Sequence, residues 1–307
     1  STPMSEAVIV STARTGLGKS YRGALNATHS VDMAGHVISH AVQRAGVDPA
    51  EVEDVILGAT FHEGAQGKNM ARLAAIRAGL PVTTAGLSIN RFCSSGLQAI
   101  ALASQRVVME KVPVMVAGGV ESISLVQNDK LNSFHATNEW LMQNKPELYL
   151  SMIETADIVA QRYNISREAQ DEFALESQKR AAAAIEEGRF KDQIAPVEIK
   201  TRKGTVVFDK DEHPKSTSAE ALAGLKPAFK KDGSVTAGNA SSLNDGAAAV
   251  VLMTAKEAAK QGKKVLARIV SWGQAGVDPK IMGTGPIPAS RAALKRSEEH
   301  TSELQSL

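Results

Sequence analysis

The chain contains a single cysteine, Cys93, and its surroundings could support nucleophilic chemistry. It lies in "LSINRFCSSGLQAIALAS", between a strand-like apolar run and an Ala/Leu-rich stretch typical of a buried helix. Ser94 and Ser95 are helix-capping residue types, so we expect Cys93 in the first turn of a helix, where the dipole and unpaired N–H groups stabilise a thiolate. A strand, a sharp turn and a nucleophile form the elbow of acyl-transfer enzymes. Because a free cysteine is also a common buried apolar residue, a catalytic and a structural cysteine both stay open on position alone.

Two other groups of residues could bind something. His36 and His40 are four residues apart and could share a metal, but they continue a polar stripe with no third ligand in view, which indicates a solvated face and no metal site. Asp245-Gly246 is typical of a tight turn before a buried strand. Just upstream, "TAGNASS" strings together small residues that let a ligand approach the backbone closely.

The composition predicts a layered α/β protein. The chain has 307 residues, of which 43% are hydrophobic and only 4% aromatic, so the core must be built from Ala, Val, Ile and Leu in one or two domains. A lone cysteine excludes an internal disulfide framework and favours a reducing compartment. No stretch has the layout of a signal peptide or a membrane span, so we expect a cytoplasmic protein. The net charge of +2 is too small to indicate a nucleic-acid partner.

Apolar runs alternate with helix-like segments in the first 121 residues, which predicts a mainly parallel sheet with helices on its faces. The expected strands are "EAVIVSTA", "VEDVILGAT", "VPVMVAGG" and "GAAAVVLMT", and the expected helices are Ser30–Arg44, Asn69–Ala78 and Ser94–Glu110.

The region from about residue 122 to 243 is more polar and looks like an insertion between two strands of this core. It should contain a charged helix, capped by Ser166 and ended by Gly188, and then a hairpin around Gly204. Residues 200–232 carry eight basic and five acidic side chains, a net charge of +3. Either a solvated surface or a site for a phosphorylated ligand would account for this charge.

Four motifs together resemble the thiolase family of acyl-CoA acyltransferases: "NRFCSSGLQAIALAS", "VMVAGGVESIS", "SREAQDEFALESQ" and "SVTAGNASSLNDGAAAVVLM". The resemblance runs from about Glu6 to Lys295 and implies a thiolase-like layered αβαβα fold. It divides the chain into an N-terminal α/β core (1–121), a loop domain covering CoA (122–243), a return to the core (244–266) and the start of a C-terminal domain (267–295). Most of the family's second half would then be absent.

The resemblance also implies a site and a reaction. Cys93 falls on the family's nucleophile, which forms an acyl-enzyme during thiolytic cleavage of 3-ketoacyl-CoA or the reverse Claisen condensation. CoA is a substrate here, no further cofactor is implied, and we expect a homo-oligomer. The expected CoA and acyl contacts are Ala237 and Ser241 at the pantetheine arm, Phe229 near CoA, Lys215 facing the nucleotide phosphates and Met152 in the acyl pocket. Ser151 stands where short-chain biosynthetic members have histidine, which predicts acyl chains longer than four carbons.

Three family features do not occur in this sequence: a Gly-His-Pro histidine, a second cysteine and an Asn-Glu-Ala-Phe stretch. A CoA-binding fragment without turnover is therefore the alternative function. A ketoacyl synthase is a further rival, but "TAGNASSLNDGAAA" speaks against it. The tail 296–307, "RSEEHTSELQSL", is expected to be non-native, because its first eleven residues match the translation of a short-read sequencing adapter.

Overall fold

The structure is a computed structural model that describes residues 6–306. The chain forms two compact units. Unit 1 comprises Ser1–Leu131, Phe190–His213 and Leu243–Ile269, and unit 2 comprises Asn132–Arg189, Pro214–Ser242 and Val270–Leu307. The region expected as one loop domain, 122–243, is thus shared between them, since its ends and its hairpin group with the sheet of unit 1.

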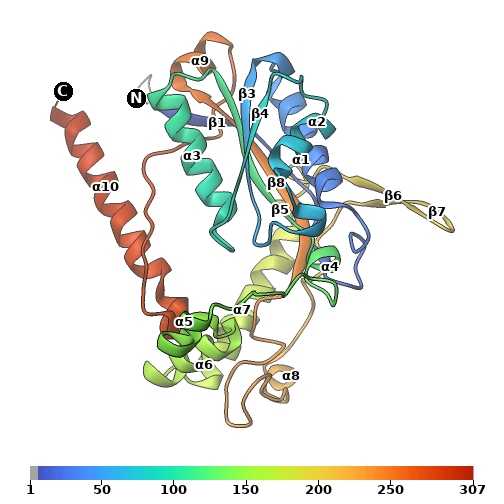
Figure 1. Cartoon of the computed structure of the whole chain (residues 1–307), viewed down its shortest axis with the longest axis vertical. Helices are drawn as coiled ribbons and strands as arrows, with labels where there is room; N and C mark the ends of the chain where they lie inside the picture. Colours follow the sequence, from blue (N-terminus) through green and yellow to red (C-terminus); the bar gives the residue numbers. More distant parts are fainter. Residues whose placement is uncertain (1–5, 307) are drawn as a thin grey trace. The chain divides into compact units, whose positions relative to one another are not determined.

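Unit 1 is built on a seven-stranded sheet, as far as the described residues show, with the order β4-β3-β5-β8-β1-β9 and β2 paired to β8 (Figure 1). The four long strands predicted from apolar runs are all present. The strands are β1 Ala7–Arg14, β2 Gly18–Lys19, β3 Val52–Gly58, β4 Ala85–Ile89, β5 Val114–Glu121, β8 Asn244–Thr254 and β9 Ala267–Arg268.

The prediction of a mainly parallel sheet is wrong. Only β3 pairs in parallel with its neighbours, β4 and β5. The strand β8 lies antiparallel between β5 and β1, with Val251 opposite Val116 and Ala249 opposite Ala13. The helices that connect β1, β3, β4 and β5 return the chain to the end of the sheet at which the previous strand began, so those strands run in the same direction. The long insertion before β8 imposes no such return, so β8 begins at the opposite end of the sheet.

Helices cover both faces of this sheet. The helices α1 (Ser30–Ala45) and α2 (Met70–Arg77) pack on one face, and α3 (Ser95–Met109) packs on the other (Figure 1). Neighbouring strand residues point to opposite faces, so Leu57 belongs to the first core and Ile56 to the second. These cores consist mainly of Ala, Val, Ile and Leu, as the composition predicts, together with Met33, Met70, Met115, Met253 and Phe208, which it did not. The remaining helical segments of unit 1 are α4 Ile123–Val126, α9 Ala255–Lys260, η1 Pro49–Glu51 and η2 Gly64–Gln66.

The hairpin predicted around Gly204 is formed by β6 (Val197–Thr201) and β7 (Gly204–Phe208), with Gly204 at a φ of 118° that favours glycine. The predicted turn at Asp245-Gly246, by contrast, is wrong. Both residues lie within β8, where Asp245 pairs with Gly18 and its carboxylate is fully buried. Hydrogen bonds to this carboxylate from the Ser124 N–H (3.1 Å) and hydroxyl (2.5 Å) outweigh the local turn preference of Asp-Gly.

Unit 2 is mainly helical in its described part. Its helix α7 (Arg167–Glu186) is the charged helix predicted from the sequence: the Ser166 hydroxyl accepts the Ala169 N–H, and Gly188 adopts a φ of 72° and donates to the Ile185 carbonyl. The other helical segments are α5 Glu139–Asn144, η3 Pro146–Tyr149, α6 Met152–Arg162, α8 Ala219–Ala223, η4 Pro279–Thr284 and α10 Pro286–Ser306.

The helix α10 continues without a break across the point where the tail was expected to become non-native. Arg296 at this point donates to the Trp272 carbonyl (2.7 Å). Glu, Leu and Gln favour helix in any context, so this continuity leaves the expectation for 296–307 untested, and Leu307 lies outside the described residues. Within the described part, no helix combines the length and apolar character needed to span a membrane.

Candidate active site

Cys93 lies on an exposed turn between β4 and α3. The strand β4 ends at Ile89 and α3 begins at Ser95, with Ser94 as its N-cap residue. The elbow of strand, turn and helix predicted from the sequence is therefore present. Cys93 itself precedes the N-cap and is not in the first helical turn, so its place in the helix was predicted one to two residues too far along.

The two serines do not cap the helix as predicted. The Ser94 side chain accepts no helical N–H and instead donates to the Arg91 carbonyl (2.9 Å). The Ser95 hydroxyl accepts the Arg91 N–H (2.8 Å) and donates to the Phe92 carbonyl (2.6 Å). Both hydroxyls thus point back into the turn that carries Cys93, where they compete successfully with capping.

The turn is conformationally demanding at the residue before the cysteine. Phe92 has a φ of 48°, in the left-handed region that a bulky side chain rarely adopts. The described hydrogen bonds of the turn use the N–H groups of Arg91, Phe92, Ser94 and Ser95, and none of them uses the N–H of Cys93. That N–H is therefore available to donate a hydrogen bond to the oxyanion that forms when the Cys93 sulfur attacks a carbonyl group.

The start of α3 approaches the sheet very closely. A Cβ placed on Gly58, at the end of β3, would lie 2.7 Å from the Ser95 carbonyl oxygen and 2.6 Å from its carbonyl carbon. Only glycine fits at this contact. This close contact places the Cys93 turn at the carboxyl ends of the parallel strands β3, β4 and β5. Open α/β sheets bind ligands at these strand ends.

The apolar face of α3 is only partly covered. Ala103 and Val107 are fully buried as predicted, but Leu97, one turn after Cys93, is 69% exposed. Phe92 on the other side of the cysteine is 68% exposed. Along the chain, Cys93 thus lies between two solvent-facing apolar side chains.

Polar residues at the same strand ends were not singled out by the sequence. The Glu121 carboxylate, at the end of β5, accepts the Thr60 N–H (2.7 Å) and the Gln66 amide (2.8 Å). The imidazole Nε2 of His62 lies 2.9 Å from the Ile89 carbonyl oxygen and 3.0 Å from that of Ala59, so its N–H is shared between the last residue of β4 and the residue after β3. Glu121 could have been found as the polar residue that ends the buried run "VMVAGGVE", whereas nothing in the local sequence marks His62.

The five residues expected to contact CoA or the acyl group all lie in unit 2. Met152 is the first residue of α6 and is 57% exposed. Its neighbour Ser151 is the N-cap, in a capping box with Glu154. The N–H and hydroxyl of Ser151 hold the pKa of the Glu154 carboxyl below its usual range. Helix capping therefore accounts for the serine at this position, and the prediction of a longer acyl chain stays a prediction.

Phe229, Ala237 and Ser241 lie on the exposed segment that follows α8, and Lys215 lies exposed before that helix. The main-chain N–H of Lys215 donates to the Gln178 side chain on α7 (3.0 Å). The segment carrying the other three is fastened to α6 by the buried Asp157 and to α7 by the buried Asp171. Asp157 accepts the Ser234 N–H (3.0 Å), Asn239 accepts the Thr236 N–H (2.8 Å), and the Asn239 amide donates to Asp171 (3.1 Å).

The described residues contain no cluster of three or more His, Cys, Asp or Glu side chains suited to a metal ion. The interpretation of His36 and His40 as a fully solvated face is wrong in part. Their rings lie 4.4 Å apart and are half-buried, and His36 Nε2 contacts the Ala195 carbonyl oxygen at 3.1 Å. Burial, with the neighbouring His36, lowers the pKa of His40.

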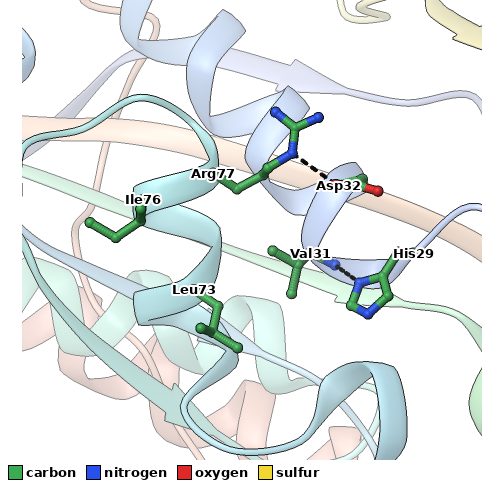
Figure 2. Close-up of a pocket in the computed structure, with 6 residues that line it drawn as sticks. All are labelled: His29, Val31, Asp32, Leu73, Ile76 and Arg77. Carbon is green, nitrogen blue, oxygen red and sulfur yellow. Dashed lines mark hydrogen bonds and ion pairs between the residues drawn. The ribbon is translucent and has the colours of Figure 1, made fainter.

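A depression of about 480 Å³ lies between α1 and α2, lined by His29, Val31, Asp32, Leu73, Ile76 and Arg77 (Figure 2). Its charged residues already pair with each other, Arg77 with Asp32 at 2.8 Å, and His29 caps α1 by accepting the Val31 N–H. It belongs to the sheet face opposite α3, so it is separate from the Cys93 turn.

Comparisons with known proteins agree with the fold. Residues 7–256 match the family described as "Thiolase, N-terminal domain". The acetyl-CoA acetyltransferase of Rhizobium meliloti is 46% identical over 300 residues, covering 94% of this chain and 76% of that protein. The Escherichia coli acetyl-CoA acetyltransferase is 44% identical over 306 residues, covering 95% and 77%. The crystal structure of the Bacillus anthracis acetyl-CoA acetyltransferase matches with a TM-score of 0.85 and 46% identity, covering 97% and 78%.

The layered α/β fold is that of the acetyl-CoA acetyltransferase structure that it matches. More particularly, the chain belongs to the thiolase family. The fold class and the family expected from the four motifs are both confirmed.

Proposed function

We propose that this chain is a thiolase acyltransferase that acts on CoA thioesters through a Cys93 acyl-enzyme. The observation that carries the proposal is an exposed cysteine with an unused main-chain N–H, held on a left-handed turn at the strand ends of a thiolase-family chain. The relatives' name, acetyl-CoA acetyltransferase, supports a CoA thioester as the substrate.

The chemistry follows from thioester exchange. The Cys93 thiolate attacks the acyl carbonyl carbon, the oxyanion accepts the Cys93 N–H, and the bond to the CoA sulfur breaks to release CoA thiolate, which takes up a proton. The product is a thioester on Cys93, so little energy separates reactants and products. In Claisen condensation, a second acyl-CoA loses an α-proton and its carbanion attacks the Cys93 thioester carbon, so that a C–C bond forms as the bond to the Cys93 sulfur breaks. In thiolytic cleavage, the Cys93 thiolate instead attacks the 3-keto carbon of 3-ketoacyl-CoA, the C2–C3 bond breaks, and the acetyl-CoA carbanion that leaves takes up a proton. CoA thiolate then attacks the Cys93 thioester and releases the shortened acyl-CoA and the Cys93 thiolate.

The residues proposed to bind CoA are Met152, Lys215, Phe229, Ala237 and Ser241. Met152 and Phe229 are exposed apolar side chains, Ala237 and Ser241 are small and exposed, and Lys215 supplies a cation for a phosphate. This set matches the parts of CoA thioesters: an apolar chain, a narrow pantetheine arm and a charged nucleotide. Under this proposal, the phosphates of CoA are the ligand for which residues 200–232 carry excess positive charge.

The alternative is a chain that binds CoA, or takes up one acyl group, without turning over. It is favoured by the single cysteine and by the lack of a Gly-His-Pro motif, because a thiolate without a partner acid or base lacks the proton transfers that each cycle needs.

One experiment separates these functions. The purified chain is mixed with isotope-labelled acetyl-CoA, and label on Cys93 and free acetoacetyl-CoA are both followed by mass spectrometry. Label on Cys93 with steady product supports the acyltransferase, whereas label without product supports the alternative. The Cys93→Ala variant is the control and should remain unlabelled. Wild-type protein that also stays unlabelled would contradict both the acyl-enzyme and the role of Cys93.

We further propose that the chain forms a homo-oligomer. The strand β4 is at an edge of the described sheet and pairs only with β3. Its sequence, Ala-Gly-Leu-Ser-Ile, contains neither the charges nor the proline with which natural edge strands avoid pairing. A second copy of the chain is the partner that the family membership supports.

A further inference from the structure

The left-handed conformation of Phe92 needs support from its surroundings. Such a conformation is strained for a non-glycine residue and persists only where neighbouring groups enforce it. The Phe92 side chain is largely exposed, so its own packing supplies little of this energy. The restraint must come from hydrogen bonds to the turn.

Asn90 provides two of these bonds with a single side chain. Its Oδ1 accepts the Phe92 N–H at 2.7 Å, an Asx turn that directly sets the entry to the left-handed residue. Its Nδ2 donates to the Thr60 carbonyl oxygen, also at 2.7 Å. The N–H of Thr60 is held in turn by the Glu121 carboxylate. Asn90 therefore links the turn after β4 to the segment that follows β3 and, through Thr60, to the last residue of β5.

These bonds have a geometric consequence for the thiol. Cys93 directly follows Phe92, so the direction of its side chain and of its unused N–H depends on the conformation at Phe92. The remaining described bonds of the turn, made by Ser94 and Ser95, fix Arg91 and the Phe92 carbonyl and leave the Phe92 N–H to Asn90 alone. An error of about 1 Å in the position of a nucleophile can reduce a rate a hundredfold.

We propose that Asn90 is a positioning residue for the acyl-transfer step: it holds Phe92 in the left-handed conformation and thereby aims the Cys93 thiolate and N–H. Asn90 acts through the turn and contacts no reacting atom. The proposal rests on the proposed function, in which Cys93 is the nucleophile. It predicts that loss of Asn90 slows acylation without weakening CoA binding, because the residues proposed to bind CoA lie on other segments.

Two variants of Asn90 and one matched control test this. Asn90→Ala removes both bonds, while Asn90→Asp keeps an acceptor for the Phe92 N–H but loses the donor to Thr60. Asn69→Ala is the control, because Asn69 also ties β4 to a neighbouring segment. Its Nδ2 donates to the Gly86 carbonyl (2.9 Å) and its Oδ1 accepts the Ser88 hydroxyl (2.9 Å), and neither bond reaches the turn that carries Cys93. The acylation rate of Cys93 at saturating acetyl-CoA, the Kd for CoA and the Tm are measured for each.

We expect acylation to be 10- to 100-fold slower in Asn90→Ala than in wild type, with a Kd for CoA within twofold of wild type. Acylation in Asn90→Asp should be at least threefold faster than in Asn90→Ala. Asn69→Ala should lower Tm and leave the rate within twofold. Asn90→Ala with an unchanged rate, or with a rate loss that Asn69→Ala reproduces at equal Tm, would overturn the proposal.

A wild-type chain that acetyl-CoA does not acylate would remove the proposed function but not this test. The rate constant for alkylation of Cys93 by iodoacetamide then serves as the measurement, since it also depends on the setting of the thiolate. We expect Asn90→Ala to change it at least threefold and Asn69→Ala to leave it unchanged. Equal rate constants in wild type and Asn90→Ala would then reject the positioning role.

Discussion

At the scale of single residues, the site shows a clear limit to what local sequence can reveal. The strand-turn-helix around Cys93 was predictable, because strand and helix have different apolar periods and small polar residues separate them. The serines were assigned to capping because that is their commonest role beside a helix. Their actual partners, Arg91 and Phe92, lie just upstream and compete for the same hydroxyls. The role of Asn90 could not be predicted from local sequence, because its second partner, Thr60, is brought close only by the fold.

Ser151 illustrates how one residue can be explained by stability alone. Its hydroxyl accepts the Glu154 N–H at the start of α6. We expect Ser151→Ala to lower the free energy of unfolding by about 1 kcal/mol, the typical value of an N-cap, in urea denaturation monitored by circular dichroism. Ser151→Asp, which retains a capping oxygen, should be close to wild type. An equal loss in both variants would show that the hydroxyl has another partner and would revive a role in acyl-chain selection.

The buried carboxylate of Asp245 should leave a signature in the pH dependence of stability. Burial raises its pKa, although the hydrogen bonds from Ser124 oppose this. A raised pKa means that the folded state holds the proton more tightly than the unfolded state, so stability falls as pH rises from about 4 through the folded pKa.

Asp245→Asn removes this titration while it keeps the shape of the side chain. We expect the stability of the variant, relative to wild type, to rise between pH 4 and pH 7 in urea unfolding. Asp209→Asn, the same substitution at an exposed position, is measured beside it as the matched control. A difference that stays flat or falls over this pH range for Asp245→Asn would contradict the assignment.

At the scale of elements, the sequence predicts which segments form strands and helices but does not predict the direction in which a strand runs. The four long strands, the three helices of unit 1 and the helix α7 follow from apolar runs and end signals. The antiparallel placement of β8 does not, since its sequence "GAAAVVLMT" suits a strand buried on both faces in either direction. Strand direction depends on where a long connection re-enters the sheet, and the polar insertion before β8 carries no sequence pattern for that.

The contact between α3 and β3 gives a sharp test at this scale. Gly58→Ala would place a methyl group 2.6–2.7 Å from the carbonyl group of Ser95, so the start of α3 must move. We expect a loss of about 1–3 kcal/mol in the free energy of unfolding, as for overpacked cores, and slower acylation of Cys93.

Gly96→Ala is the matched control for Gly58→Ala, because it lies in α3 with no atom near the new methyl group. Alanine is favoured over glycine within a helix, so this variant should be as stable as wild type or more so. Comparable losses of stability in the two variants would mean that the close approach of α3 to β3 is not what requires glycine at position 58.

At the scale of the whole molecule, the exposed edge of unit 1 predicts self-association. A strand edge with unpaired backbone groups and apolar side chains readily pairs with another chain. On β4, Leu87 is 45% exposed although it lies in a strand beside the core, and Phe92 just beyond the strand is more exposed still. We expect sedimentation equilibrium to show a dimer or a higher oligomer at micromolar concentration.

Leu87→Lys places a charge on the edge strand β4 and should raise the Kd for self-association at least tenfold. Leu87→Val keeps an apolar strand-forming residue and should leave the Kd within a few-fold of wild type. Monomeric wild-type protein, or an oligomer equally stable in both variants, would show that β4 is not the site of association.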